Sequence, residues 1–516
     1  MAKRITVLIV LDGWGIGKNN ESNPIYVAKA PTFLRLAADY PMTSLQASGI
    51  AVGLPWGEVG NSDVGHLTLG AGKVLYQYYP KITMAIQDGS FFENKVLKDA
   101  CAHARATGGA INFAGLLSKS NVHASLEHLL ALITMAQHEQ VPRINLHLFA
   151  DGKDVPPRSI EGYLRELPGE YLATLIGRYY AMDHEHNWSL TETAYQLMTG
   201  RDGVGESAPD GNAAAMLARN YALGQTEEYL SPVRFREDGA IKDGDSLFFF
   251  NYREDGIRQL ASAFIVPGFD KFVTVPFKDL HIATMTHYHD TFAAPVAFPA
   301  DTVEYPLGKV LSDAGLAQLR LAETYKYAHV TYFFNGYRES PYPGEFRTLI
   351  PSQTELHPEQ HPGMMAGPIT DRLIEAIRDR AFDFILVNYA NADTIAHTAD
   401  YNAGVEAVKV LDREMGRLFA AVGDDPDTLI AITSDHGNVE RMIDEATGLP
   451  DNQHNTDPVP FHLIAPQLKG RRFVNADNLS LETLGSLADV APTLLALMGV
   501  HPPADMTGRS ILDGLV

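Results

Sequence analysis

The sequence predicts an α/β protein in which a doubly wound sheet domain is interrupted by an inserted α/β domain. Three short apolar runs, typical of parallel strands buried on both faces, lie far apart in the chain. They span residues 5–11 (ITVLIVL), 382–387 (FDFILV) and 429–433 (LIAIT). A long middle section carries strand and helix patterns of its own. The length of 516 residues also exceeds what one hydrophobic core supports.

The three apolar runs end in groups that can bind metal ions. Asp12 follows the first run, Asp393 and His397 follow the second, and Asp435 and His436 follow the third. Open α/β sheets place their active sites at the carboxyl ends of the strands. We therefore expect these side chains to converge at one sheet edge, although they are far apart in the sequence.

The middle section is predicted to form the inserted domain. Strands are expected over 146–150 (LHLFA) and 246–250 (SLFFF), and helical periodicity extends over 124–138 and 191–198. The chain is expected to cross between the domains near 76–79 and near 294–300. We therefore expect residues 1–77 and 300–516 to form a metal-binding domain and residues 78–299 to form an inserted substrate domain.

Composition excludes several classes of partner. The formal net charge is −22, and such an acidic protein repels nucleic acid. Cys101 is the only cysteine, so no internal disulfide or thiolate metal cluster can form, which favours a reducing cytoplasm.

The apolar run 5–11 ends in Asp-Gly without a cleavage site and is interpreted as a strand rather than a secretion signal. No stretch approaches the roughly 20 apolar residues of a membrane span. We expect a cytoplasmic monomer.

The candidate metal ligands combine carboxylates and imidazoles. Asp393 and His397 are four residues apart, so on a helical turn they share one face. Taken singly, each candidate could equally be a helix cap or a turn residue. Together they favour a site for divalent ions, with manganese preferred and zinc or cobalt as alternatives. The candidates are Asp12, Asp393, His397, Asp435, His436 and His454.

Ser62 lies in the segment GNSDVGH, just before an apolar run. The structural interpretation is that this serine caps a helix. The functional interpretation is that a bound metal lowers the pKa of its hydroxyl, which then attacks phosphorus. A helix that begins here would also help to hold the phosphoryl oxygens.

A family resemblance favours the functional interpretation. In order along the chain stand VLIVLDGWGIG, GNSDVGHLTLGAGKVLYQ, FADGKDVPPRS, GRYYAMD, ETYKYAHVTYFFNGYRE, NYANADTIAHT, TSDHGNVE and HNTDPVPF. These segments resemble successive motifs of the cofactor-independent phosphoglycerate mutases, and they span nearly the whole chain. The resemblance implies an alkaline-phosphatase-like fold with an inserted phosphotransferase domain. It also implies an isomerase that interconverts 3- and 2-phosphoglycerate, with two divalent ions and without 2,3-bisphosphoglycerate as a cofactor.

The resemblance assigns roles position by position. Ser62 becomes the phosphoserine intermediate, and Asp154 shuttles a proton between the two glycerate hydroxyls. Lys326 neutralises charge on the transferring phosphoryl group, whereas His123 and Arg253 bind the substrate. One metal would be held by Asp393, His397 and His454, and the other by Asp12, Ser62, Asp435 and His436.

The chain departs from the family pattern around the substrate. The arginine expected before Asp154 is Lys153, and the arginines expected at three further positions are His184, Leu190 and Gly256. Charge-assisted hydrogen bonds contribute about 1.5–3 kcal/mol each, so their loss requires substitutes. The candidate substitutes are Lys153, His184, His186 and Arg258.

These departures leave alternatives to the mutase interpretation. A relative with an altered anion site would act on another phosphorylated or phosphonate acid. A metallophosphatase would transfer the phosphoryl group from Ser62 to water, but His123 and Asp154, which would hold the acceptor, argue against it. A binding protein with a decayed site is disfavoured because the metal ligands and the nucleophile are intact.

Overall fold

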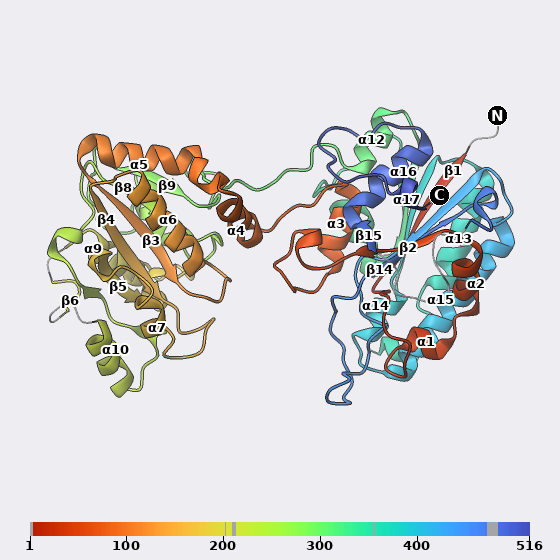
Figure 1. Ribbon diagram of the computed structural model, residues 1–516, viewed down its shortest axis with the longest axis horizontal. Coiled ribbons are helices and arrows are strands. Elements are labelled where there is room, and N and C mark those ends of the chain that lie inside the picture. Colours follow the sequence, from red (N-terminus) through yellow and green to blue (C-terminus); the bar gives the residue numbers. More distant parts are fainter. Residues whose placement is uncertain (1–3, 202, 209–212, 354–356, 472–482, 516) are drawn as a thin grey trace. The chain divides into compact units, whose positions relative to one another are not determined.

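The computed structural model describes residues 4–201, 203–208, 213–353, 357–471 and 483–515. The chain forms two compact units, one of Met1–Gln77 with Asp301–Val516 and the other of Tyr78–Ala300 (Figure 1). Each unit has its own sheet covered by helices, which confirms the predicted α/β class.

The first unit is built on an eight-stranded sheet in the order β11-β10-β12-β1-β13-β14-β2-β15. The five strands from β11 to β13 are parallel, and β14 is antiparallel to both of its neighbours. The strands are β1 (Ile5–Leu11), β2 (Met42–Gln46), β10 (Gln318–Glu323), β11 (Glu345–Ile350), β12 (Phe384–Tyr389), β13 (Thr428–Thr433), β14 (Val459–Ile464) and β15 (Thr483–Ser486).

Helices cover both faces of this sheet, because the apolar side chains of β1 alternate between its two faces. Ile5, Val7 and Ile9 pack in one core with α2, α13 and α15, while Leu8 and Val10 pack in another with α3, α12 and α16. Strands buried in this way become continuous apolar runs in the sequence. The helices of the unit are α1 (Pro24–Ala28), α2 (Pro31–Asp39), α3 (Ser62–Ala71), α12 (Leu307–Asp313), α13 (Ala366–Asp379), α14 (Asn391–Ala396), α15 (Tyr401–Val422), α16 (Val490–Met498) and α17 (Leu512–Leu515).

The second unit contains a seven-stranded sheet in the order β6-β7-β5-β4-β3-β8-β9. Its central strands are parallel, and β7 is antiparallel to β5. The strands are β3 (Ala110–Leu117), β4 (Arg143–Ala150), β5 (Leu172–Gly177), β6 (Glu206–Ser207), β7 (Val233–Arg234), β8 (Ser246–Phe249) and β9 (His281–Thr284).

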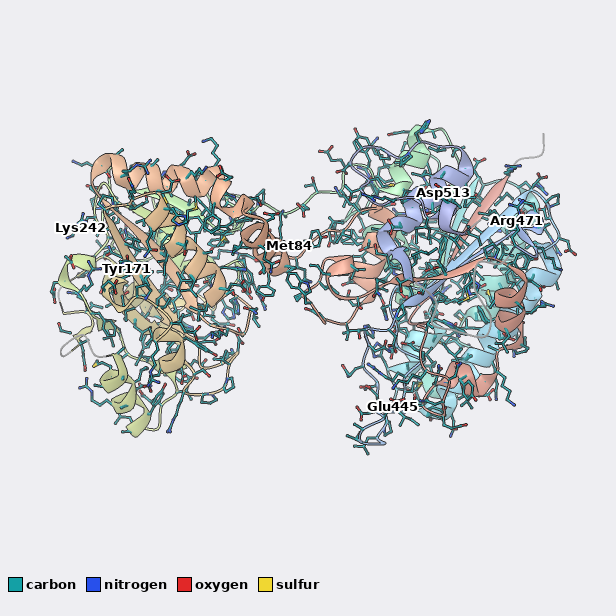
Figure 2. The ribbon with its side chains drawn as sticks, viewed as in Figure 1. Met84, Tyr171, Lys242, Glu445, Arg471 and Asp513 are labelled. Carbon is teal, nitrogen blue, oxygen red and sulfur yellow. The ribbon has the colours of Figure 1, made fainter. Side chains whose placement is uncertain are left out.

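One continuous apolar core joins this sheet to its helices. The helices are α4 (Tyr78–Asp88), α5 (Lys95–Thr107), α6 (Leu126–His138), α7 (Ile160–Leu164), α8 (Arg178–Ala181), α9 (Trp188–Met198), α10 (Ala213–Ala222) and α11 (Arg258–Ile265). Figure 2 marks Met84, Tyr171 and Lys242 in this unit, and Glu445, Arg471 and Asp513 in the other.

The strand predicted over 382–387 begins two residues later and extends to Tyr389. The reason is its pairing with β1, which runs from Thr6 opposite Phe384 to Leu11 opposite Tyr389. Asp383 stands just before the strand and accepts a hydrogen bond from the Ala317 amide. Among the described residues, no helix combines the length and apolarity needed to cross a membrane.

Gly65 allows α3 to approach the end of β13 closely. A Cβ atom at this position would lie 2.5 Å from the carbonyl oxygen of Asp435 and 2.7 Å from its Cβ. Because backbone cannot yield as a flexible side chain can, any larger residue must push the helix away from the strand end. The same approach brings Ser62 Oγ, at the start of α3, to 3.0 Å from His436 Nε2.

We predict that Gly65→Ala destabilises the protein by about 1–3 kcal/mol, because the added methyl group overpacks a backbone contact. The matched control is Gly367→Ala in α13, where a Cβ would meet nothing within 4 Å. That substitution should leave stability unchanged or raise it by up to about 1 kcal/mol. Urea unfolding of both variants measures the difference, and equal stability would show that the approach of α3 is not tight.

Candidate functional site

The register of the parallel strands gathers three buried carboxylates at one sheet edge. Val10 in β1 lies opposite Asn388 in β12 and Thr433 in β13, so the chain leaves all three strands at the same level. Asp12 follows β1, Asp393 lies in α14 after β12, and Asp435 follows β13. All three are almost completely buried.

Ser62 is the first residue of α3, and its hydroxyl faces this edge. Asn61 caps the helix by accepting a hydrogen bond from the Val64 amide, so the Ser62 side chain is not needed as the cap. Its Oγ donates to Asp12 Oδ1 at 3.2 Å and lies 3.0 Å from His436 Nε2. The structural interpretation of Ser62 as a cap is therefore wrong.

Lys326 brings a positive charge to the same point from the turn after β10. Its Nζ donates to Asp12 Oδ1 at 2.6 Å, to Asp393 Oδ2 at 2.7 Å and to Ser62 Oγ at 2.7 Å. Burial by itself would lower the pKa of Lys326, but the neighbouring carboxylates raise it above its ordinary value. The Lys326 ammonium group is therefore held in its charged form.

The carboxylates remain crowded despite this cation. Burial and the charge of Asp435 raise the pKa of Asp12 to about 7. The pKa of Asp393 is lowered well below its usual range: burial opposes the shift, but Lys326 and His397 outweigh it. More positive charge than one lysine supplies is needed to keep all three acids ionised.

Two histidines lie beside Asp393 with their ring nitrogens directed at one point. The Nε2 atoms of His397 and His454 are 2.9 Å apart and lie 3.3 Å and 3.2 Å from Asp393 Oδ1. Their Nδ1 atoms lie 2.9 Å and 2.7 Å from the carbonyl oxygens of Asn452 and Gly60. A carbonyl only accepts, so in the neutral rings Nδ1 holds the hydrogen and both Nε2 lone pairs face each other.

This donor set fits divalent metal ions. Facing lone pairs beside a carboxylate are satisfied by a cation, and metal-binding histidines commonly donate their other N–H to a backbone carbonyl. Around Asp12, the ligand atoms of Asp393 and His436 lie within 4.8 Å of one another, as do those of His66 and Asp435. The edge thus offers room for more than one ion.

His66 and Asn388 are neighbours of the carboxylates that the sequence pattern did not predict as site residues. His66 Nδ1 lies 2.9 Å from the Ser62 carbonyl oxygen and 3.2 Å from Asp435 Oδ2. The Asn388 amide donates to Asp12 Oδ2 at 2.7 Å and lies 3.0 Å from His66 Nε2. Both residues lie in quoted motifs, GNSDVGH and NYANADTIAHT, and this position is the sequence signal that could have identified them.

The second unit brings His123 and Asp154 near each other. His123 Nε2 lies 3.8 Å from Asp154 Oδ2. Arg178, which follows β5, binds both Asp154 and Asp151. Burial alone would raise the pKa of Asp151, but hydrogen bonds from Ser118, the Asp154 amide and Arg178 lower it. Asp151 thus anchors the turn that presents Asp154.

Arg253 joins this group through Asp255. The Asp255 carboxylate lies 2.8 Å from Arg253 Nη2 and 3.4 Å from His123 Nδ1. The Arg253 amide also donates to the His123 carbonyl oxygen at 3.3 Å. Burial, reinforced by the charge of Arg178, lowers the pKa of His123, so its ring is kept neutral. Arg178, Asp151 and Asp255 were not predicted, although Arg178 lies in the quoted motif GRYYAMD.

The remaining predicted substrate residues lie around this group. Lys153 is exposed on the turn between Asp151 and Asp154. His184 is exposed, and its Nε2 atom lies 3.8 Å from Glu185 Oε1. The Arg258 guanidinium donates to the Tyr288 carbonyl oxygen at 2.9 Å and to Glu254 Oε1 at 3.1 Å. The side chains of His184 and Arg258 line a common pocket.

Comparison with known proteins places this arrangement among metalloenzymes. Residues 4–502 match the model of the metalloenzyme superfamily. The chain is 42% identical to the 2,3-bisphosphoglycerate-independent phosphoglycerate mutase of Moorella thermoacetica, over 99% of this chain and 98% of that protein. Identity to the protein of the same name from Pseudomonas aeruginosa is 43%, over 98% of each.

A solved structure is also similar over its full length. The phosphoglycerate mutase of Leishmania mexicana, whose crystal structures were determined at low cobalt concentration, is 27% identical with a TM-score of 0.53. The match covers 99% of this chain and 98% of that one.

We predict that Lys326→Met destabilises the metal-free protein by about 3–5 kcal/mol, because it leaves buried Asp12 and Asp393 without their cation. Lys309→Met is the matched control, since Lys309 forms an exposed pair with Asp313 in the same unit. Denaturant unfolding after dialysis against a chelator measures the effect. If Lys326→Met were as stable as the control, the three carboxylates would not depend on this lysine.

Proposed function

The chain belongs to the metalloenzyme superfamily and to the 2,3-bisphosphoglycerate-independent phosphoglycerate mutases, and we propose that this isomerase interconverts 3- and 2-phosphoglycerate through a phosphoserine at Ser62. The observation that carries this proposal is the surrounding of the Ser62 hydroxyl. It receives a hydrogen bond from Lys326 and donates one to Asp12, at the start of a helix.

In the first half of the proposed reaction, Ser62 Oγ attacks the phosphorus of 3-phosphoglycerate. The bond between phosphorus and the O3 atom of glycerate breaks, and a bond to Oγ forms. Asp12 Oδ1 is placed to receive the Ser62 proton, since it accepts the hydrogen bond of that hydroxyl. The ammonium group of Lys326 and the amides at the start of α3 stabilise the charge on the phosphoryl oxygens.

In the second half, glycerate O2 attacks the phosphorus, the bond between phosphorus and Ser62 Oγ breaks, and Asp12 returns the proton to Oγ. Asp154 gives a proton to O3 as that oxygen leaves and takes the proton from O2 when O2 attacks. Arg178 and the Asp151 turn hold the Asp154 carboxylate in place. Arg253 and His123 bind glycerate throughout, and Asp255 fixes the positions of both.

We propose two sets of metal ligands, and short distances among their side chains support each set. Asp393, His397 and His454 would hold one divalent ion, and Asp12, Ser62, Asp435 and His436 would hold another. When bound, such ions neutralise phosphoryl charge and lower the pKa of a coordinated hydroxyl. Manganese suits this mixture of carboxylates and imidazoles, with cobalt or zinc as alternatives.

We further propose that the protein acts in the cytoplasm on a small phosphorylated acid. Its single cysteine, Cys101, is buried, and burial raises its thiol pKa to about 12, so it supplies neither a disulfide nor a reactive thiolate. This is the cysteine usage of a protein in a reducing compartment.

We predict that Ser62→Ala reduces mutase turnover on the order of 10⁴-fold or more, because the group that accepts the phosphoryl is lost. The fold should be retained, as should the ion proposed to be held by Asp393, His397 and His454. Ser340→Ala is the control, since Ser340 is exposed in the same unit. The assay follows the conversion of 3- to 2-phosphoglycerate together with release of free phosphate. Substantial mutase turnover in Ser62→Ala would refute the phosphoserine route.

Removal of metal provides an independent test. Dialysis against a chelator should abolish turnover, because the crowded carboxylates and facing imidazoles then lack their cations. Addition of manganese or cobalt should restore it, with elemental analysis run on the same samples. Full turnover in protein shown to be metal-free would contradict the two-metal proposal.

A further inference from the structure

The second unit contains a pocket of about 420 Å³ that the proposed mechanism does not use. Three histidines, an arginine and two aromatic rings line it: His184, His186, Trp188, Arg258, His289 and Phe292. His184, Arg258 and His289 are exposed, while Trp188 and Phe292 are half-buried. The pocket is therefore open to solvent and is lined by both aromatic rings and nitrogen-bearing side chains.

His289, which lines the pocket, carries a hydrogen-bond donor on its ring. The Thr291 amide donates to His289 Nδ1 at 3.2 Å, and the Thr291 hydroxyl lies 2.8 Å from the same atom. Because Nδ1 accepts, the hydrogen of the neutral ring is on Nε2. The Phe292 ring lies 5.7 Å from the imidazole and supports its orientation.

Arg258 supplies a permanent positive charge. Its Nε atom donates to the Tyr288 carbonyl oxygen and its Nη2 atom donates to Glu254, which fixes the plane of the guanidinium. Among the residues that the structure describes, Nη1 has no partner and remains free to donate. A fixed guanidinium with a free N–H is suited to binding a carboxylate or a phosphate.

The loop that forms the opposite wall is held rigidly. Gln259 accepts a hydrogen bond from the His186 amide at 3.1 Å and donates to Asp183 and Thr191 at 2.8 Å and 2.6 Å. These bonds hold His186 in a left-handed conformation (φ 63°), with its ring 5.8 Å from that of Trp188. The wall is thus formed before a ligand arrives, which lowers the entropy lost on binding.

The acidic groups nearby are already paired. Asp255 also lines the pocket, but its carboxylate binds Arg253 and approaches His123. Asp183 accepts hydrogen bonds from Asn187 and Gln259. A ligand in this pocket would therefore meet donors, and through Asp255 the pocket adjoins the residues proposed to bind glycerate.

The arginines that the family resemblance leads one to expect are missing from this region. Their positions are His184, Leu190 and Gly256. At Gly256, a Cβ atom would lie 2.6 Å from Met182 Cε, so the methionine occupies the space that a longer side chain would need. Hydrogen bonds to the carboxylate of the substrate must therefore come from other residues.

We propose that this pocket is the subsite for the carboxylate of the acid substrate, and that Arg258 and His289 determine specificity there by donating hydrogen bonds to it. The proposal rests on the proposed function, since it takes the substrate to be a phosphorylated acid bound beside His123 and Arg253. It assigns to two residues, one from α11 and one from the loop after β9, the contacts that arginines would otherwise make.

The test compares Arg258→Ala and His289→Ala with wild type. Each should raise KM for 3-phosphoglycerate about tenfold or more with little change in kcat, as loss of a ground-state contact predicts. Arg258→Lys should recover part of the loss. The control is Arg165→Ala, because Arg165 forms a matching exposed pair with a glutamate four residues away but does not line the pocket. Kinetics of Arg258→Ala and His289→Ala that equal those of Arg165→Ala would overturn the proposal.

Calorimetric binding of 3-phosphoglycerate separates this proposal from the proposed function. If wild type binds the compound without converting it, the mutase function fails. The pocket is then judged by Kd alone, which should rise about tenfold in both variants. An unchanged Kd overturns the pocket proposal even if turnover is normal. Absence of binding to wild type would overturn both.

Discussion

Mutual repulsion among three buried carboxylates is the constraint on which the rest of this site depends. Asp12, Asp393 and Asp435 stand at one sheet edge because three parallel strands end there at the same level. Coulomb repulsion between such groups amounts to several kcal/mol at the effective dielectric of a protein. Cations placed between the carboxylates offset this repulsion. Lys326 is a cation that the chain itself supplies, and its hydrogen bonds to two of the acids and to Ser62 place the Ser62 hydroxyl within the same charge cluster.

The two units hold different kinds of chemistry. In the first, carboxylates and imidazoles concentrate charge around a serine at a helix start, which is suited to receiving a phosphoryl group. In the second, Arg178 and Asp151 position one carboxylate, and Asp255 positions one histidine and one arginine. A neutral histidine, together with arginines and carboxylates that form ion pairs, is suited to binding an acid and to transferring a proton to or from its hydroxyl groups. In the proposed reaction, the first unit thus supplies the phosphoryl chemistry and the inserted unit supplies substrate recognition.

Much of the first unit could be predicted from the sequence because of one physical rule. Strands buried on both faces are apolar throughout, and where they end in a parallel sheet their following residues must meet, so Asp12, Asp393 and Asp435 were predictable together. The partners of these groups were not. The bond of Arg178 to Asp154 and the bridge from Asn388 to His66 depend on side-chain direction, which no spacing reveals. The pocket around Arg258 and His289 likewise joins segments whose proximity only the folded sheet creates.

The proposed reaction depends most on a covalent phosphoryl group at Ser62, which is directly observable. Manganese-loaded protein turning over 3-phosphoglycerate should be quenched in acid within a few milliseconds and its peptides analysed by mass spectrometry. We predict a phosphorylated peptide that contains Ser62, present only with substrate and lost when excess glycerate is added before the quench. Turnover at a normal rate with no phosphorylated Ser62 at any quench time would contradict the account, because the phosphoryl group would then pass to its acceptor without this serine.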